Sequence, residues 1–222
     1  MSYKHLPFVT ASMVAVLLIS NIAAVKPVQM FGLITDGGTL LFPLAYIFGD
    51  VLTEVYGYQQ SRRVIWTGFF WLLAAALIFQ LVLLAPPADG YMLQESFEAI
   101  LGQTPRIVAA SLIAYLAGEF VNAFILSRMK VIMQGRALWM RTIGSTIAGQ
   151  AVDTLLFVLI AFYGLDWASY EVLLNMIITG YLLKVSIEVL FTPVTYRVVH
   201  ILKRDEGVDV YDEGIDYNPF LL

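Results

Sequence analysis

The stretch VIWTGFFWLLAAALIFQLVLLA, residues 64–85, decides the class of fold. It contains no charged residue, follows Arg62-Arg63 and ends at Pro86-Pro87. A helix of about 20 consecutive apolar residues crosses the hydrocarbon core of a bilayer, and proline commonly marks a helix boundary. Residues 64–85 are therefore predicted to form a transmembrane helix.

The composition of the whole chain also indicates a membrane protein. Hydrophobic residues make up 59% of its 222 residues and charged residues only 14%, whereas soluble domains average about 45–50% apolar and about 25% charged residues. This balance excludes a large aqueous enzyme with a separate substrate domain. Because cysteine is absent, a disulfide framework, a thiolate nucleophile and a zinc–thiolate site are also excluded. A net charge of −4 argues against nucleic-acid binding.

Apolar segments that could cross a bilayer occupy residues 7–25, 40–55, 64–85, 107–126, 143–163 and 170–199. We therefore expect an all-α membrane protein whose six transmembrane helices form a single domain, residues 1–204. Residues 91–102 place apolar side chains among acids and suit a short interfacial helix. Residues 205–222 carry six acids between Asp205 and Asp216, which predicts a solvated and mobile acidic tail.

Basic residues set the expected orientation. When the amino terminus is placed in the cytoplasm, ten lysines and arginines fall inside, and only Lys26 and Arg106 fall outside. The positive-inside bias requires this asymmetry. We therefore expect a multi-pass protein with both termini in the cytoplasm. The two histidines, His5 and His200, lie too far apart in the sequence to suggest a metal site.

Polar residues interrupt four of the predicted spans in pairs three or four residues apart. These pairs are Asp50 and Glu54, Glu119 and Asn122, Gln150 and Asp153, and Lys184 and Glu188. Each pair shares a helix face, and a charged residue at the centre of a span costs roughly 2.5–3.5 kcal/mol on insertion scales. The least costly arrangement points all four faces inward, around a polar pocket. Asn21 lies near the end of the first span, with Lys26 just beyond it.

Structural roles for these residues remain open alternatives. Lys184 could pair with Glu188 on its own helix or with Asp153 on a neighbouring one. Asp50 and Glu54 could lie at the cytoplasmic interface, because Arg62 and Arg63 follow closely, and Asn21 could cap a helix end or bond across the bundle.

A pocket rich in carboxylates and amides favours ligands that donate hydrogen bonds. A guanine-like edge presents a ring N–H beside an exocyclic amine, and one carboxylate can accept both. Thiamine-like and other cationic heterocycles suit the same pocket, whereas a phosphate or dicarboxylate does not, because few cations face inward. The sequence carries no nucleophile elbow, zinc-protease, P-loop or dinucleotide motif, so we expect neither an enzyme nor a cofactor.

The stretch GDVLTEVYG, residues 49–57, followed by Ser61-Arg62 and Ile65-Trp66, resembles the signature of the queuosine precursor transporter family, also called vitamin uptake transporters. Weaker similarities follow in the right order. They are Asn21 through Lys26, Asp36-Gly37-Gly38, Phe42-Pro43, residues 118–122, Asp153-Thr154-Leu155, Ala161-Phe162 and Lys184-Val185 before Pro193. The resemblance covers roughly residues 7–200.

This resemblance implies uptake of the 7-deazaguanine queuosine precursors, in nitrile and aminomethyl forms, across the inner membrane. It also implies a fold similar to the substrate-binding components of energy-coupling-factor transporters, and it allows a homodimer. Glu119, Asn122 and Asp153 would recognise the guanine-like edge within the polar pocket that Gln150 also lines. Asp50 and Glu54, or Lys184 and Glu188, would gate or shape that pocket, and Asn21 would lie near its external mouth.

Transport by alternating access without ATP is the mechanism that we expect. Proton coupling and facilitated diffusion both stay open. The main rival is an energy-coupling-factor component that binds a vitamin and needs separate ATPase subunits, and a non-transporting structural membrane protein is a third alternative.

Overall fold

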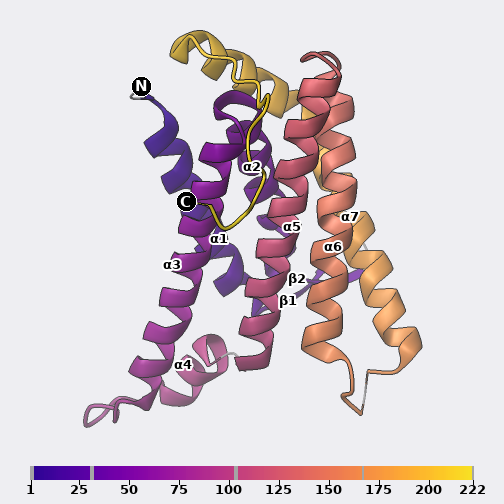
Figure 1. The fold of residues 1–222 in the computed structure, drawn as a ribbon. Coiled ribbons are helices and arrows are strands. Elements are labelled where there is room, and N and C mark those ends of the chain that lie inside the picture. The colour runs from indigo at the N-terminus through magenta and orange to yellow at the C-terminus, as the bar shows by residue number, and fades with distance from the viewer. Residues whose placement is uncertain (1–2, 31–32, 103–104, 167, 222) are drawn as a thin grey trace.

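The structure is a computed structural model that describes residues 3–30, 33–102, 105–166 and 168–221. Its helices form a bundle with a small hairpin at one side (Figure 1). The helices are α1 (Leu6–Ala24), α2 (Phe42–Tyr56), α3 (Tyr58–Leu84), α4 (Gln94–Leu101), α5 (Pro105–Ile132), α6 (Leu138–Phe162) and α7 (Tyr170–Glu206). A 3-10 turn, Gly37–Leu40, precedes α2. The prediction of an all-α membrane protein is confirmed, apart from the hairpin.

Each of the six predicted spans contains a helix, but α2 differs from the others. Within the described residues, five helical segments are long and apolar enough to cross a membrane, and they contain α1, α3, α5, α6 and α7. Helix α2 has 15 residues, about 22 Å at 1.5 Å per residue, against a hydrocarbon thickness of about 30 Å. Twelve of those residues are buried. The neighbouring helices, rather than lipid, therefore surround α2.

The small hairpin was not expected from the sequence, which has no alternating apolar pattern there. Strands β1 (Pro27–Met30) and β2 (Leu33–Asp36) pair antiparallel between α1 and α2, with Pro27 opposite Asp36. Gly37 follows the hairpin, and a Cβ atom there would lie 2.6 Å from the carbonyl oxygen of Ala23. The end of the hairpin therefore returns close to the end of α1.

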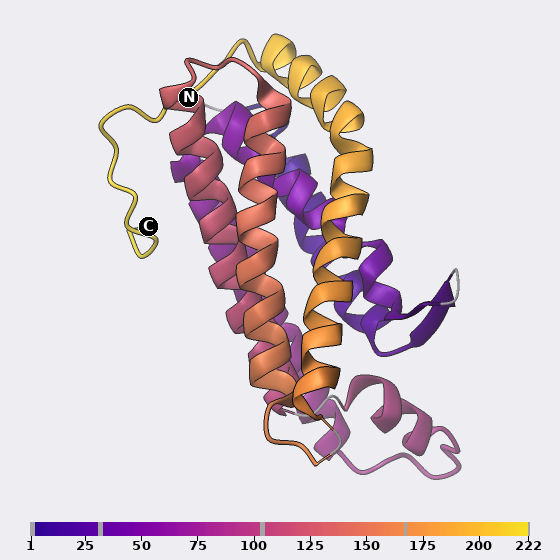
Figure 2. The same ribbon diagram turned by 90° about the vertical axis from the view of Figure 1, so that its right-hand side faces the viewer.

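Helix α7 is longer than the predicted span because it continues from Val199 to Glu206. It contains Pro193, which lacks the N–H that a helix interior requires. In Figure 2 the carboxyl-terminal part of α7 leans over the end of the bundle. The backbone N–H of Lys4 donates to Glu206 Oε2 at 2.9 Å. The start of the chain and the end of α7 therefore lie together at one end, as the predicted orientation requires.

Helix α4 forms where a short amphipathic helix was expected. It lies beside the carboxyl-terminal end of α3, at the end of the bundle opposite the amino terminus (Figure 1), and none of its residues is buried.

Residues 207–221 pack along α3 and α5 as an extended strap (Figure 1), although Asp209, Glu213 and Asp216 are exposed, as a solvated tail predicts. Asp212 is buried and accepts hydrogen bonds from the backbone N–H of Tyr58 and from Ser127 Oγ, at 2.8 and 2.6 Å. Arg62 donates to the backbone carbonyl of Asn218 at 2.7 Å. The acids and carbonyls of the tail therefore serve donors on the bundle, which the charge pattern alone could not indicate.

Helices α5 and α6 approach each other closely at two glycines. A Cβ atom on Gly118 would lie 3.1 Å from the carbonyl oxygen of Gly149, and one on Gly149 would lie 3.0 Å from that of Gly118. Small residues allow helix backbones to meet in this way within membranes. The contact brings the polar residues of α5 and α6 to the same level of the bundle.

Candidate functional site

Polar side chains from α2, α5, α6 and α7 meet inside the bundle, as the four shared faces predicted. We call this set the central polar cluster; it consists of Asp50, Glu119, Asn122, Gln150, Asp153, Lys184 and Glu188. All but two of its members are at most 5% exposed. The side chains of Asp153 and Lys184 are 13% and 17% exposed.

Asp50 and Asn122 join α2 to α5. The Asn122 amide donates to Asp50 Oδ1 at 2.8 Å. Its own carbonyl oxygen is buried and has no hydrogen-bond partner in the part of the chain that the structure describes. An acceptor is therefore left over on Asn122 for another molecule.

Glu119 lies against the backbone of α2. A Cβ atom on Gly49 would lie 2.6 Å from Glu119 Oε2, so the glycine makes room for the carboxylate. Glu119 is 0% exposed, and neither of its oxygens has a hydrogen-bond partner among the described residues. The buried hydroxyl of Tyr46 is in the same state. Buried polar atoms in proteins are nearly always paired, so this group of unpaired atoms marks a candidate ligand site.

Lys184 pairs with Asp153 on α6, with Nζ and Oδ2 2.6 Å apart. This contact fulfils one of the two structural alternatives, and no ion pair between Lys184 and Glu188 occurs among the described residues. The ammonium group of Lys184 also lies 5.7 Å from the centre of the Phe42 ring. Glu188 Oε1 accepts from Thr146, while its Oε2 has no partner within the described chain.

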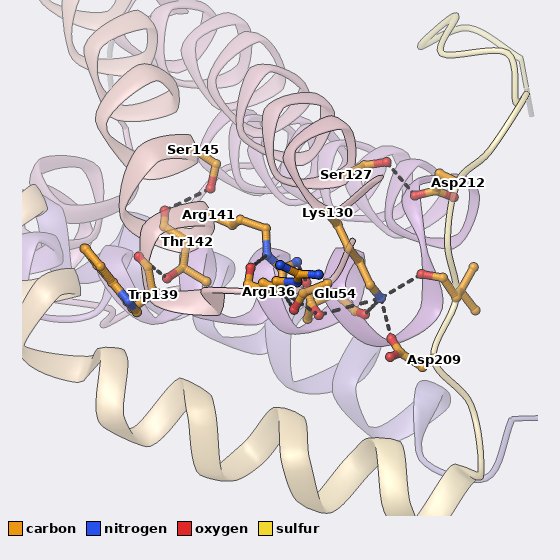
Figure 3. Close-up of polar contacts among 12 residues, drawn as sticks. Glu54, Ser127, Lys130, Arg136, Trp139, Arg141, Thr142, Ser145, Asp209 and Asp212 are labelled. Carbon is orange, nitrogen blue, oxygen red and sulfur yellow. Dashed lines mark hydrogen bonds and ion pairs between the residues drawn. The ribbon is translucent and has the colours of Figure 1, made fainter. Parts of the chain in front are cut away.

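Glu54 is one turn beyond Asp50 but belongs to a different set, which we call the Glu54 ion-pair cluster; Figure 3 labels Glu54, Lys130, Arg141 and Asp209 of this set. It consists of Glu54, Lys130, Arg141, Lys203 and Asp209. Lys203 Nζ lies 2.6 Å from Glu54 Oε1, Lys130 Nζ lies 3.6 Å from it, and Arg141 binds Oε2. Glu54 is only 1% exposed. The alternative that Glu54 lies at the cytoplasmic interface stays a prediction; within the described residues its ion-pair partners are Lys130, Arg141 and Lys203, and not Arg62 or Arg63.

Lys130, Arg141 and Lys203 were not predicted as partners of Glu54, because the sequence indicated only that they are charges of cytoplasmic segments. Asp209 completes the set: its Oδ1 lies 2.6 Å from Lys130 and 2.7 Å from Lys203. Their sequence separations, up to 149 residues between Glu54 and Lys203, follow no local spacing. The cluster ties α2, α5, α6, α7 and the tail together at the end of the bundle that holds the amino terminus and the end of α7.

Asn21 lies apart from the central polar cluster. Its amide donates to the carbonyl of Leu17 at 3.0 Å, and its Oδ1 accepts from Ser111 Oγ at 3.2 Å. It lines a mostly apolar cavity of about 200 Å³ between α1, α3, α4 and α5. The structure does not bring Asn21 to the other predicted residues, and its expected place near the external mouth of the pocket stays a prediction.

The central polar cluster is closed in this conformation. The cleft beside Asp50 and Glu188 is lined by Thr142, Thr146, Thr192 and Thr195 and has no room for a water molecule. The polar groups meet as predicted, whereas a chamber sized for a flat base is not open at this cleft. A ligand could reach these groups only if the helices move apart.

The profile of the family described as "Putative vitamin uptake transporter" matches residues 36–198. The chain belongs to this family. The matched segment contains every residue of the central polar cluster, whereas Asn21, Lys203 and Asp209 lie outside it.

Individual relatives of this chain carry a narrower name. A "Probable queuosine precursor transporter" of Bacillus subtilis (strain 168) is 33% identical over 84% of this chain and 81% of its own length. The "Queuosine precursor transporter" of Escherichia coli (strain K12) is 26% identical over 91% and 90%, and a further "Probable queuosine precursor transporter", from Haemophilus influenzae, is 24% identical over 83% and 77%. No solved structure matches the chain.

Together, the family and the apolar helices establish a multi-pass membrane protein related to transporters. The resemblance first noted at residues 49–57 is thereby confirmed. The relatives are named as transporters, which agrees with the expectation of a protein that is not an enzyme.

Proposed function

We propose that this protein imports the queuosine precursors 7-cyano- and 7-aminomethyl-7-deazaguanine through the central polar cluster. The observation that carries the proposal is the set of buried, unpaired oxygens on Glu119 and Asn122, in a bundle whose relatives are named queuosine precursor transporters. Glu119 accepts the ring N–H and the exocyclic amine of the base, and charge assistance strengthens both bonds.

The remaining members of the cluster frame the base. Gln150 and Asn122 offer amides for its other polar atoms, while Asp153 is held by Lys184. Asp50 and Glu188 shape the site from α2 and α7. Glu54 takes no part in recognition here, because three cations already occupy it.

Transport in this proposal proceeds by alternating access to the cluster. The closed arrangement fits an occluded state, in which α2 is enclosed by the longer helices. We further propose location in the inner membrane with both termini in the cytoplasm, and assembly as a homodimer, which size-exclusion chromatography with light scattering would test.

The test is thermal stabilisation of the purified protein by a panel of ligands. We expect both 7-deazaguanines to raise Tm, whereas thiamine, biotin and riboflavin leave it unchanged. Glu119→Gln should lose this shift, because an amide cannot accept two N–H donors as a carboxylate does. Glu95→Gln on exposed α4 is the matched control and should keep the shift.

Two outcomes would count against the proposal. Stabilisation by a vitamin, together with co-purification of ATPase subunits, would favour the energy-coupling-factor alternative. Equal binding of the base by Glu119→Gln and the unaltered protein would remove Glu119 from recognition.

A further inference from the structure

Five carboxylates inside the bundle, four of them buried and Asp153 partly buried, divide into two kinds. Glu54 and Asp153 face cations, with Lys203 and Lys184 respectively at 2.6 Å. Asp50, Glu119 and Glu188 have no lysine or arginine within ion-pair distance in the described parts of the chain. Asn122 and Thr146 give Asp50 and Glu188 one neutral donor each, but Glu119 has none.

The groups that face Glu119 come from every polar helix of the bundle. Helix α2 contributes Tyr46 and Asp50, its own helix contributes Tyr115, and α6 and α7 contribute Asp153 and Glu188. The remaining contact is Gly49, which has no side chain. The nearest acids would repel a charge on Glu119, and the one lysine of the cluster is held by Asp153.

An ionised Glu119 would be an uncompensated charge at a fully buried position. Such a charge costs several kcal/mol after relaxation. The protonated form avoids this cost, so a neutral carboxyl group is the less costly form of Glu119 when no ligand donates to it.

The recognition of a guanine-like edge requires the opposite form. A protonated carboxyl carries an O–H donor, which opposes a ligand N–H, whereas a carboxylate accepts two N–H donors side by side. The two N–H groups of the bound base supply the hydrogen bonds that the structure does not provide for Glu119.

We propose that Glu119 exchanges its proton for the base: binding a queuosine precursor breaks the O–H bond of Glu119 and releases one proton to water. This inference rests on the proposed function. The proton and the base then compete for one carboxylate, so the affinity for the base falls as the pH falls.

The experiment is calorimetric titration of the full-length protein with 7-cyano-7-deazaguanine, in buffers of different ionisation enthalpy at the same pH. We expect about one proton released per base bound, and a Kd that rises by up to roughly tenfold for each unit of falling pH. Glu95→Gln should release the same proton. If Glu119→Gln still binds the base, it should release no proton on binding. If Glu119→Gln does not bind the base at all, that result agrees with the proposal provided that the unaltered protein releases one proton.

Other results would overturn the inference. Binding by the unaltered protein without proton release, or with the same Kd across the pH range, would show that Glu119 does not exchange a proton. Proton release that persists in Glu119→Gln but disappears in Glu188→Gln would assign the proton to Glu188. Absence of any binding to the unaltered protein would instead contradict the proposed function.

Discussion

Gly49 leaves room for the Glu119 carboxylate, because a Cβ atom there would lie 2.6 Å from Glu119 Oε2. Elsewhere in a helix, exchange of glycine for alanine stabilises by roughly 1 kcal/mol. At this position the new methyl group must displace the carboxylate that we assign to recognition. The identity of one small residue therefore decides where a functional group on the next helix can lie.

We predict that Gly49→Ala lowers Tm and abolishes stabilisation by the base. In the Glu119→Ala background the same change should raise Tm, because the methyl group then meets no carboxylate. A double-mutant cycle of Tm values measures this coupling. Additive effects of the two changes would contradict the close contact.

Asp209 is the residue whose charge contributes to stability in a pH-dependent way. Burial acts to raise the pKa of Asp209, but hydrogen bonds from Lys130 and Lys203 outweigh it and hold that pKa below its ordinary value. Its stabilisation is therefore present above the unfolded pKa of about 3.9 and is lost as the pH falls through the lower, folded value.

We predict that Asp209→Asn lowers Tm at neutral pH and that the difference from the unaltered protein shrinks below about pH 4. Glu213→Gln, on an exposed tail residue, is the control and should change Tm little at any pH. A constant difference across the pH range would show that the charge of Asp209 contributes nothing.

At the scale of elements, the tail is the segment whose observed position differs most from the one expected from the sequence. Ser127 Oγ donates to Asp212 Oδ2 at 2.6 Å, so these side chains of α5 and the tail are in contact. A disulfide tests whether their backbones also lie close together. The chain has no cysteine of its own, so an introduced pair cannot exchange with a native one.

We predict that Ser127→Cys/Asp212→Cys forms an intramolecular disulfide under mild oxidation and that the oxidised form has the higher Tm. The two single variants serve as controls. Mass spectrometry that finds two free thiols after oxidation would place the tail away from α5.

Helix α2 illustrates how an element can differ from its sequence pattern. Its apolar residues predicted a span like the others, yet it is about 8 Å shorter than a hydrocarbon core of about 30 Å. Burial by neighbouring helices allows Asp50 and Glu54 on one short helix to reach two separate polar clusters.

For the whole molecule, the hydrogen bond from the backbone N–H of Lys4 to Glu206 places the start of α1 and the end of α7 at the same end of the bundle. The loop before α4 and the loop between α5 and α6 lie at opposite ends (Figure 1). Basic residues are in excess at the end that holds the start of α1 and the end of α7. This excess, combined with the arrangement of the loops, predicts that this end faces the cytoplasm.

We predict that Glu95→Cys is labelled by a membrane-impermeant maleimide in intact cells, whereas Arg136→Cys is labelled only after the cells are permeabilised. Both residues are exposed. Labelling of both cysteines from the same side would overturn the arrangement, and the reverse pattern would invert the orientation.

The sequence by itself determined the membrane class, the positions of the helices and the family. Apolar runs such as residues 64–85 and the motif at residues 49–57 are local features, and each helix satisfies its own backbone hydrogen bonds. Helical spacing also predicted that Glu119, Asn122 and Gln150 would face the interior, because residues three or four apart share a face.

Only the tertiary structure decided which charges meet. Lys203 reaches Glu54 across 149 residues of sequence, Lys184 chooses Asp153 over Glu188, and Asp212 anchors a tail that looked solvated. The low dielectric inside the bundle makes an unpaired buried charge costly, but helix packing determines which partners lie within reach of it. Among the described residues, packing gives Glu119 no hydrogen-bond partner, and this is the physical basis of the proposed site.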